Sequence, residues 1–102
     1  MVKEYKIGGK LVTLYTVGEL ASAIGRVPVT VRKWELFGNI PRAALRDKAG
    51  RRLYYKEEVN ALVKILVEED VRAGSAISLT KLKERTFKEW GEIRKKHKGE
   101  IK

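Results

Sequence analysis

Two stretches near the N-terminus alternate between apolar and polar residues, which is typical of half-buried β-strands. They cover residues 4–7 and 10–15 and are joined by Gly8-Gly9. Glycine readily adopts the positive φ angles that a two-residue hairpin turn requires. The pattern therefore predicts a β-hairpin within residues 1–15. This hairpin should pack on the following segment, because an isolated hairpin is only marginally stable in water.

The hydrophobic period then changes from that of a strand to that of a helix. Thr16 and Glu19 have the spacing of a capping box, in which each side chain accepts from the backbone N–H of the other residue. Gly25 is placed to end the helix in a left-handed conformation. The apolar positions recur at helical spacing: Val17, Leu20, Ala21 and Ile24. A short first helix is therefore expected.

A second helix is expected between Val27 and Gly38. Pro28 suits a first helical turn, because its missing N–H would have no partner there in any case. Three apolar residues at regular spacing are expected to face the core: Val31, Trp34 and Phe37. Two short helices separated by a turn that contains glycine form a helix-turn-helix.

A basic hairpin and a longer helix follow. Residues 43–46 and 52–55 have the pattern of two strands around a tip at 47–51. Residues 57–72 show the clearest helical pattern, which Gly74 is expected to end. The apolar stripe of this helix comprises Val59, Leu62, Val63, Leu66 and Val67. The order of helix, turn, helix, basic hairpin and helix is that of a winged helix-turn-helix.

A last helix is expected at residues 79–96. Its apolar residues are expected to close the core (Leu79, Leu82, Phe87) or, further along, to support self-association (Trp90, Ile93). Trp90 is alternatively an anchor of the core. As an alternative, its cations offer a second contact to nucleic acid: Lys81, Lys83, Arg85, Lys88, Arg94, Lys95 and Lys96. His97 is expected to be solvated in a frayed tail.

Together these elements predict a mainly α fold with small β-hairpins, built as a winged helix-turn-helix of about four helices. The expected organisation has three parts. Residues 1–15 form the N-terminal hairpin and residues 16–75 the winged helix-turn-helix. Residues 76–102 form a basic helix and tail, which either pack on the domain or mediate self-association as a homodimer or larger homo-oligomer.

The charge of the chain indicates a polyanionic partner. Lys and Arg number 23 against 13 Asp and Glu, which gives a net charge of +10. Residues 26–56 hold nine of the cations and two of the carboxylates, and residues 76–102 hold nine and four. A solubilising coat would be spread more evenly along the chain. Because the first basic block coincides with the second helix and the basic hairpin, double-stranded DNA is the expected partner.

Other classes of protein are disfavoured by the composition. The chain has no cysteine, so disulfides and thiolate sites are excluded. No apolar run is long enough to span a membrane, and the N-terminus lacks the apolar core of a signal peptide, which favours a cytoplasmic, nucleoid-associated protein. His97 has no carboxylate or thiol cluster around it in the sequence. We therefore expect no enzymatic activity, metal, cofactor or small-molecule ligand.

Several of these residues resemble the N-terminal DNA-binding domain of the MerR family. The resemblance is carried by residues 15–21, Gly25, Thr30-Val31-Arg32, Glu35, Gly38, residues 50–54, Ala73-Gly74, Ser78-Leu79 and Leu82. Residues 31–35 (Val-Arg-Lys-Trp-Glu) are also similar to the excisionase-like domains of phages and mobile elements. The resemblance implies a helix in the major groove, a wing on the neighbouring backbone and commonly a two-fold symmetric dimer on a palindrome.

The second helix leaves four residues for a groove: Val29, Thr30, Arg32 and Lys33. Arginine can bond guanine O6 and N7 together, threonine can contact a phosphate or a thymine methyl, and lysine acts as a point charge. The alternative for Arg32 and Lys33 is a solvated helix face. The alternative for Val29 is a cover over the core.

The second hairpin supplies a further set of cations: Arg46, Lys48, Arg51 and Arg52. Their guanidinium and ammonium groups could clamp phosphates or enter a minor groove. The resemblance implies that Arg52 and Tyr54 match the wing's Arg-x-Tyr, in which the Arg binds phosphate and the Tyr hydroxyl assists. The alternative for Tyr54 is a packed aromatic. Arg26 in the turn and Arg42 after Pro41 are further candidates for backbone contacts.

The chain departs from full-length MerR regulators in ways that bear on function. It stops near the point where a long dimerising helix would begin, and the metal-binding cysteines of the metalloregulators are absent. The Gly8-Gly9 hairpin is an addition, and Tyr55 stands where Ser, Thr or Asp would normally cap the next helix. These departures favour the small phage-type and excisionase-like members that lack an effector domain.

Three roles are compatible with the sequence. The first is sequence-specific DNA binding by a small phage or mobile-element regulator. The second is architectural, as in an excisionase-like recombination factor or the DNA-recognition subunit of a packaging machine. The third is a protein-interaction adaptor that uses Leu36 and the last helix. An RNA partner is disfavoured by the single groove-sized helix and the few exposed aromatics.

Overall fold

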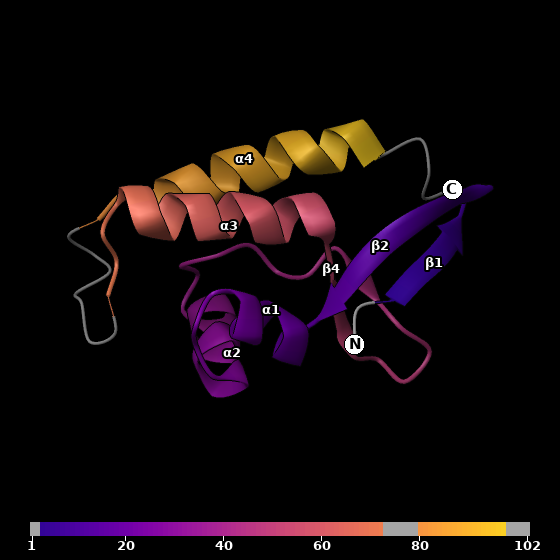
Figure 1. The fold of residues 1–102 in the computed structure, drawn as a ribbon, viewed down its shortest axis with the longest axis horizontal. Coiled ribbons are helices and arrows are strands. Elements are labelled where there is room, and N and C mark those ends of the chain that lie inside the picture. The colour runs from indigo at the N-terminus through magenta and orange to yellow at the C-terminus, as the bar shows by residue number, and fades with distance from the viewer. Residues whose placement is uncertain (1–2, 73–79, 98–102) are drawn as a thin grey trace.

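The computed structural model describes residues 3–72 and 80–97. Within them the helices are α1 (Val17–Ala23), α2 (Pro28–Leu36), α3 (Lys56–Glu68) and α4 (Leu82–His97), and the strands are β1 (Lys3–Ile7), β2 (Lys10–Thr16), β3 (Leu45–Arg46) and β4 (Arg52–Tyr55). Figure 1 shows α3 and α4 side by side as one layer, with α1 and α2 on the other side of α3. The predicted mainly α winged helix-turn-helix is confirmed.

The N-terminal hairpin and the wing belong to one sheet. The strands follow the order β1-β2-β4-β3, and each neighbouring pair is antiparallel. Tyr5 lies opposite Val12 in the first pair, and Tyr15 lies opposite Tyr54 in the second. Because β2 bridges the hairpin and the wing, the segment ahead of the first helix supports the wing strands directly.

The helix-turn-helix forms for the local reasons that the sequence indicates. The Thr16 N–H donates to Glu19 Oε1 over 2.9 Å, and the Glu19 N–H donates to Thr16 Oγ1 over 3.2 Å, which completes the predicted capping box. Gly25 and Gly38, with φ values of 69° and 76°, follow the ends of α1 and α2 in the left-handed conformation. The ends of both helices are therefore encoded by nearby residues.

The end of α3 differs from the prediction. The helix ends at Glu68, earlier than the predicted residue 72. Asp70 has a φ of 52°, and the Val71 N–H donates to the Leu66 carbonyl over 2.9 Å. Aspartate tolerates the left-handed conformation better than most residues, so Asp70 ends the helix in place of glycine. Gly74 lies outside the described residues.

Two clusters of buried side chains form the core. The larger joins all four helices and includes Leu20, Val31, Leu62, Leu82 and Trp90. The smaller lies at the sheet and consists of Val12, Leu14, Leu53 and Tyr55. Leu82 of α4 is buried in the larger cluster, so the last helix closes the core as predicted. Ile93, predicted to support self-association, packs against both clusters instead.

Three apolar residues predicted to face the core are exposed instead. Phe37, Val67 and Phe87 have exposed fractions of 70%, 74% and 44%. Phe37 lies beyond the last turn of α2, at its C-cap. The buried positions of α4 include Leu82, Thr86 and Trp90, so this four-residue spacing turns Phe87 away from the main stripe. Leu79, also predicted to close the core, lies outside the described residues.

Two residues near the C-terminus are buried. Trp90 is fully buried and its Nε1–H donates to the Glu58 carbonyl over 2.9 Å, which favours the core position over a place in a self-association interface. His97 is also buried, which contradicts the predicted solvated tail. Its ring stacks on Tyr55 with centroids 4.1 Å apart, and Nε2 lies 2.9 Å from Glu57 Oε2.

A buried carboxylate joins the start of α3 to α4. Glu58 Oε1 accepts from the Tyr55 N–H over 2.9 Å, and Glu58 Oε2 lies 2.7 Å from Arg94 Nε. Burial raises the pKa of Glu58, although the Arg94 charge opposes the shift. The Glu58 carboxylate thus binds the backbone at the N-terminus of α3, where Tyr55 stands in place of a usual capping residue.

Candidate nucleic-acid interface

Helix α2 presents one apolar and one polar face. Val31 and Trp34 are buried against the core. Arg32 and Lys33 are exposed on the opposite side, because neighbouring positions on a helix point in different directions. Val29 is half exposed and Thr30 is partly exposed. The structure therefore places all four predicted groove residues where a ligand can reach them.

The wing turn is organised by one carboxylate. Asp47 Oδ1 accepts from the N–H groups of Ala49 and Arg51, each over 2.9 Å, and Asp47 Oδ2 lies 3.0 Å from Arg51 Nε. These contacts, led by the backbone N–H of Arg51, lower the pKa of Asp47. The sequence prediction treated the tip only as a basic loop and missed this role of Asp47. Its spacing from Ala49 is that of an Asx turn, the signal that could have revealed it.

The cations of the wing differ in how they are held. Arg46 Nη1 donates to the Gly50 carbonyl over 2.8 Å, so its side chain lies along the turn. Arg51 is oriented by its ion pair with Asp47, although 76% of its side chain is exposed. Lys48 is exposed at the tip. The hairpin therefore carries three exposed cations on a turn with defined internal hydrogen bonds.

An ion pair joins the wing to α2. Arg52 Nε lies 2.9 Å from Glu35 Oε1, and Glu35 Oε2 accepts from the Ala43 N–H over 3.1 Å. The exposed fractions of the two side chains are 27% for Arg52 and 7% for Glu35. Arg52, predicted as a phosphate ligand, is thus already engaged by a carboxylate. In the structure it positions β4 relative to α2.

Tyr54 is a core residue, so its predicted assignment as a DNA ligand needs correction. The side chain is fully buried, and its ring lies 5.8 Å from that of Trp90. Its hydroxyl has no hydrogen-bond partner among the described residues. Burial raises the pKa of Tyr54, and the Glu35 charge adds to the shift. A side chain without accessible surface cannot bond a phosphate, which favours the alternative of a packed aromatic.

The two further arginine candidates have different environments. Arg26 donates to the carbonyls of Ile24 and Val71, over 3.1 Å and 2.9 Å, and its guanidinium lies 6.0 Å from the centre of the Trp34 ring. These contacts hold the turn of the helix-turn-helix against the end of α3. Arg42 has an exposed side chain, and its carbonyl accepts from Arg94. Of the two, Arg42 is the one with a side chain available to a ligand.

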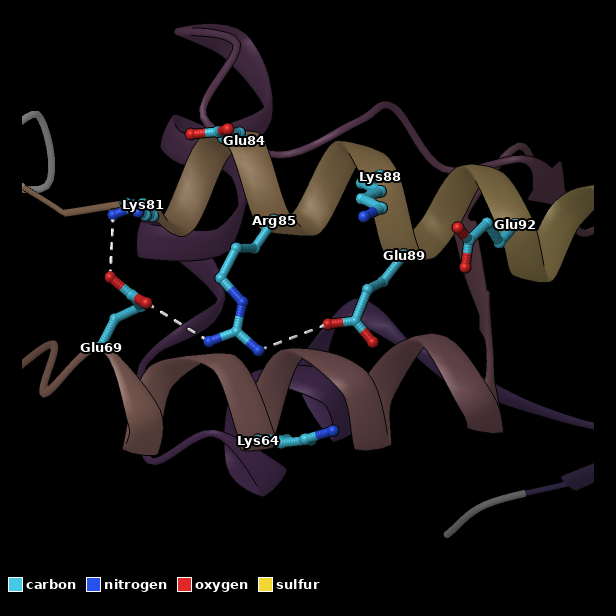
Figure 2. A pocket seen from close by; sticks show the side chains of 8 residues that line it. All are labelled: Lys64, Glu69, Lys81, Glu84, Arg85, Lys88, Glu89 and Glu92. Carbon is cyan, nitrogen blue, oxygen red and sulfur yellow. Dashed lines mark hydrogen bonds and ion pairs between the residues drawn. The ribbon is translucent and has the colours of Figure 1, made fainter.

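The outer groove between α3 and α4 carries charges of both signs. Figure 2 shows Arg85 of α4 directed towards Glu69, which follows the last residue of α3, and towards Glu89 of its own helix. Arg85 Nη2 also lies 2.6 Å from Glu68 Oε1. The groove has a volume of about 660 Å³ and is lined by lysines, glutamates and Arg85. Because Arg85 is surrounded by carboxylates, the structure disfavours it as a contact to nucleic acid.

The described residues hold neither a cluster that could bind a metal ion nor a helix that could span a membrane. In residues 3–72 and 80–97, no three His, Asp or Glu side chains gather as a metal site would require. In the same ranges, no helix is long and apolar enough to cross a membrane.

Comparison with known families agrees with this geometry. Residues 15–71 match the family model described as "MerR HTH family regulatory protein". No curated protein and no solved structure matches the chain. The matched segment covers more than half of the 102 residues and contains both helices of the helix-turn-helix, the wing and α3. The chain belongs to the MerR HTH family.

Proposed function

We propose that the protein binds double-stranded DNA in a sequence-specific manner, with α2 in the major groove and the wing on the adjacent phosphate backbone. One observation carries the proposal: the exposed cations of α2 and of the wing stand on two elements that the Glu35–Arg52 ion pair ties together. An α-helix fits the major groove, and a basic hairpin beside it can reach the flanking phosphates.

The exposed residues divide into two groups by chemistry. Arg32 has the geometry to read guanine through two hydrogen bonds, and Val29 and Thr30 have methyl groups that can contact thymine. Lys33 and the cations of the wing suit phosphates, whose contacts fix the register of the protein on the duplex. Neutralising phosphates releases counterions, so binding should weaken steeply as the salt concentration rises.

We further propose that this DNA-binding protein is a regulator of a phage or a mobile element. The matched family is one of regulatory proteins, which favours control of transcription. The similarity of residues 31–35 to excisionase-like domains favours a phage or mobile-element setting. These arguments concern the biological role, and the DNA-binding proposal does not depend on them.

An architectural role is the second candidate. Exposed lysines lie along α4, which Figure 1 shows on the opposite side of α3 from α2. These are Lys83, Lys88, Lys95 and Lys96. A duplex seated on α2 would leave them free for a second duplex, which is the arrangement that bridging requires. This candidate predicts binding with little sequence preference.

The test is in vitro selection of bound duplexes from a random pool, repeated at two salt concentrations. A consensus that retains affinity at the higher salt supports sequence-specific recognition. Binding without a consensus supports the architectural candidate instead. No binding at either salt concentration contradicts both and favours the protein-interaction adaptor.

A further inference from the structure

Strand β1 forms one edge of the sheet. It pairs with β2 on one side, and no strand of the described residues pairs with it on the other. An edge strand presents unpaired N–H and C=O groups, to which another chain can add a strand. The open edge of β1 is therefore a candidate interaction surface.

The turn of the hairpin determines which residues of β1 face this edge. Gly8 and Gly9 both have positive φ angles, 57° and 82°, as a type I′ turn requires. Such a turn closes with hydrogen bonds between Ile7 and Lys10. Bonding alternates along an antiparallel pair, so Ile7 and every second residue before it bond towards β2.

The two remaining interior residues carry opposite charges. By this alternation Glu4 and Lys6 direct their N–H and C=O groups towards the open edge. Both side chains are exposed, and both lie on the same face because they are two residues apart. Tyr5 and Ile7 are partly buried on the other face.

We propose that β1 pairs in an antiparallel manner with β1 of a second copy of the chain, about a two-fold axis at Tyr5. In this register Glu4 lies opposite Lys6 of the partner subunit, and the outward backbone groups of both residues are matched. Tyr5 lies opposite Tyr5 of the partner subunit. Opposite charges and aromatic pairs directly across two strands are stabilising.

Two neighbouring symmetric registers are less favourable because they place like charges opposite each other. An axis at Glu4 would place two glutamates opposite each other, and an axis at Lys6 would place two lysines opposite each other. Like charges directly opposite are destabilising. Only the axis at Tyr5 also lets all five residues of β1 pair, so charge and length select the same register.

The consequence is a continuous sheet that contains the wings of both copies. Its strands follow the order β3-β4-β2-β1 in one copy and the reverse order in the other. Two α2 helices would then be related by a two-fold axis, as a palindromic site requires. This last step rests on the proposed function, whereas the pairing itself does not.

Charge reversal tests the register. Sedimentation velocity over a concentration series of the full chain should show a monomer–dimer equilibrium. Glu4→Lys or Lys6→Glu should each raise the dissociation constant of the dimer by about tenfold or more, because two attractive pairs become repulsive. The double variant Glu4→Lys/Lys6→Glu should restore the dimer, and so should an equimolar mixture of the two single variants.

Cysteine trapping gives an independent readout in this cysteine-free chain. Tyr5 would face itself across a non-hydrogen-bonded pair with Cα atoms about 4.5 Å apart, which is within disulfide range. Tyr5→Cys should therefore form a disulfide-linked dimer under mild oxidation, whereas Glu4→Cys, the matched control, should form far less. Thermal unfolding of every variant checks that the fold is retained.

Three results would overturn the pairing. They are a wild-type chain that stays monomeric at all concentrations, a dimer that is indifferent to both charge reversals, and more efficient trapping by Glu4→Cys than by Tyr5→Cys. A monomer that still binds DNA would refute the pairing and leave the proposed function intact. A dimer that binds no DNA would support the pairing and contradict the proposed function.

Discussion

Arg52 Nε of the wing strand lies 2.9 Å from Glu35 Oε1 of α2, although the two residues are 17 positions apart in the chain. The contact joins the two elements that the proposed function uses together. Because Glu35 also accepts from the Ala43 N–H, one carboxylate holds three segments in place: the helix, the connecting loop and β4. The spacing between the exposed cations of α2 and those of the wing is therefore a property of the fold.

Removing this carboxylate should lower the stability of the fold. Glu35→Ala leaves the Ala43 N–H without its acceptor and Arg52 without its ion pair. We expect the free energy of unfolding in urea to fall by about 1–3 kcal/mol. Glu35→Gln keeps an oxygen acceptor for Ala43 and should cost less. A double-mutant cycle with Arg52→Ala should give a coupling of about 0.5–3 kcal/mol, and additive effects would show that the contact contributes nothing.

The wing turn should loosen in acid as Asp47 becomes protonated. The pKa of Asp47 lies below its ordinary value of 3.8 because the Arg51 and Ala49 N–H groups stabilise the carboxylate. A lowered pKa in the folded state stabilises the turn above the unfolded pKa, and this stabilisation is lost as the pH falls through the folded pKa. The amide chemical shifts of Ala49 and Arg51 should therefore titrate with a midpoint below 3.8.

Asp47→Asn is the matched control for this titration. The asparagine oxygen can still accept from the backbone, but it carries no charge to titrate, so the transition in the Ala49 and Arg51 shifts should disappear. A wild-type midpoint at or above the ordinary pKa of Asp would contradict the described turn.

Two aromatic residues of α4 should differ sharply in their contribution to stability. Trp90 is fully buried and bonded to the Glu58 carbonyl, whereas Phe87 is 44% exposed. Trp90→Ala should lower the free energy of unfolding by about 3–5 kcal/mol. Phe87→Ala, on the same helix, should lower it by less than about 1 kcal/mol. Equal losses in chemical denaturation would mean that α4 packs on α3 through a different face.

The sequence predicts those parts of the fold that depend on nearby residues. Thr16, Glu19 and Gly25 specify the first helix, and the spacing of Val31 and Trp34 specifies the buried face of the second. Each signal lies within a few positions of the feature it controls. For this reason the helix-turn-helix and the exposed positions of α2 follow from the pattern alone.

Some predictions fail because a distant segment decides the outcome. His97 looks like a solvated tail residue until α4 is placed beside Tyr55 and Glu57. Tyr54 looks like a DNA ligand until the folded core buries it, and the ion pair of Arg52 with Glu35 forms only once β4 lies beside α2. No local pattern encodes these contacts, because each joins residues on separate elements.

The most direct test of the central claim is the affinity of Arg32→Ala for a selected duplex, compared with the wild type and with Lys88→Ala at one salt concentration. Arg32 lies on the exposed face of α2, whereas Lys88 lies on α4, on the opposite side of α3. We expect Arg32→Ala to lose about 1–3 kcal/mol of binding free energy and its preference at one base position. Lys88→Ala should bind as the wild type does. If Arg32→Ala binds the selected duplex as tightly as the wild type, α2 is not the recognition helix.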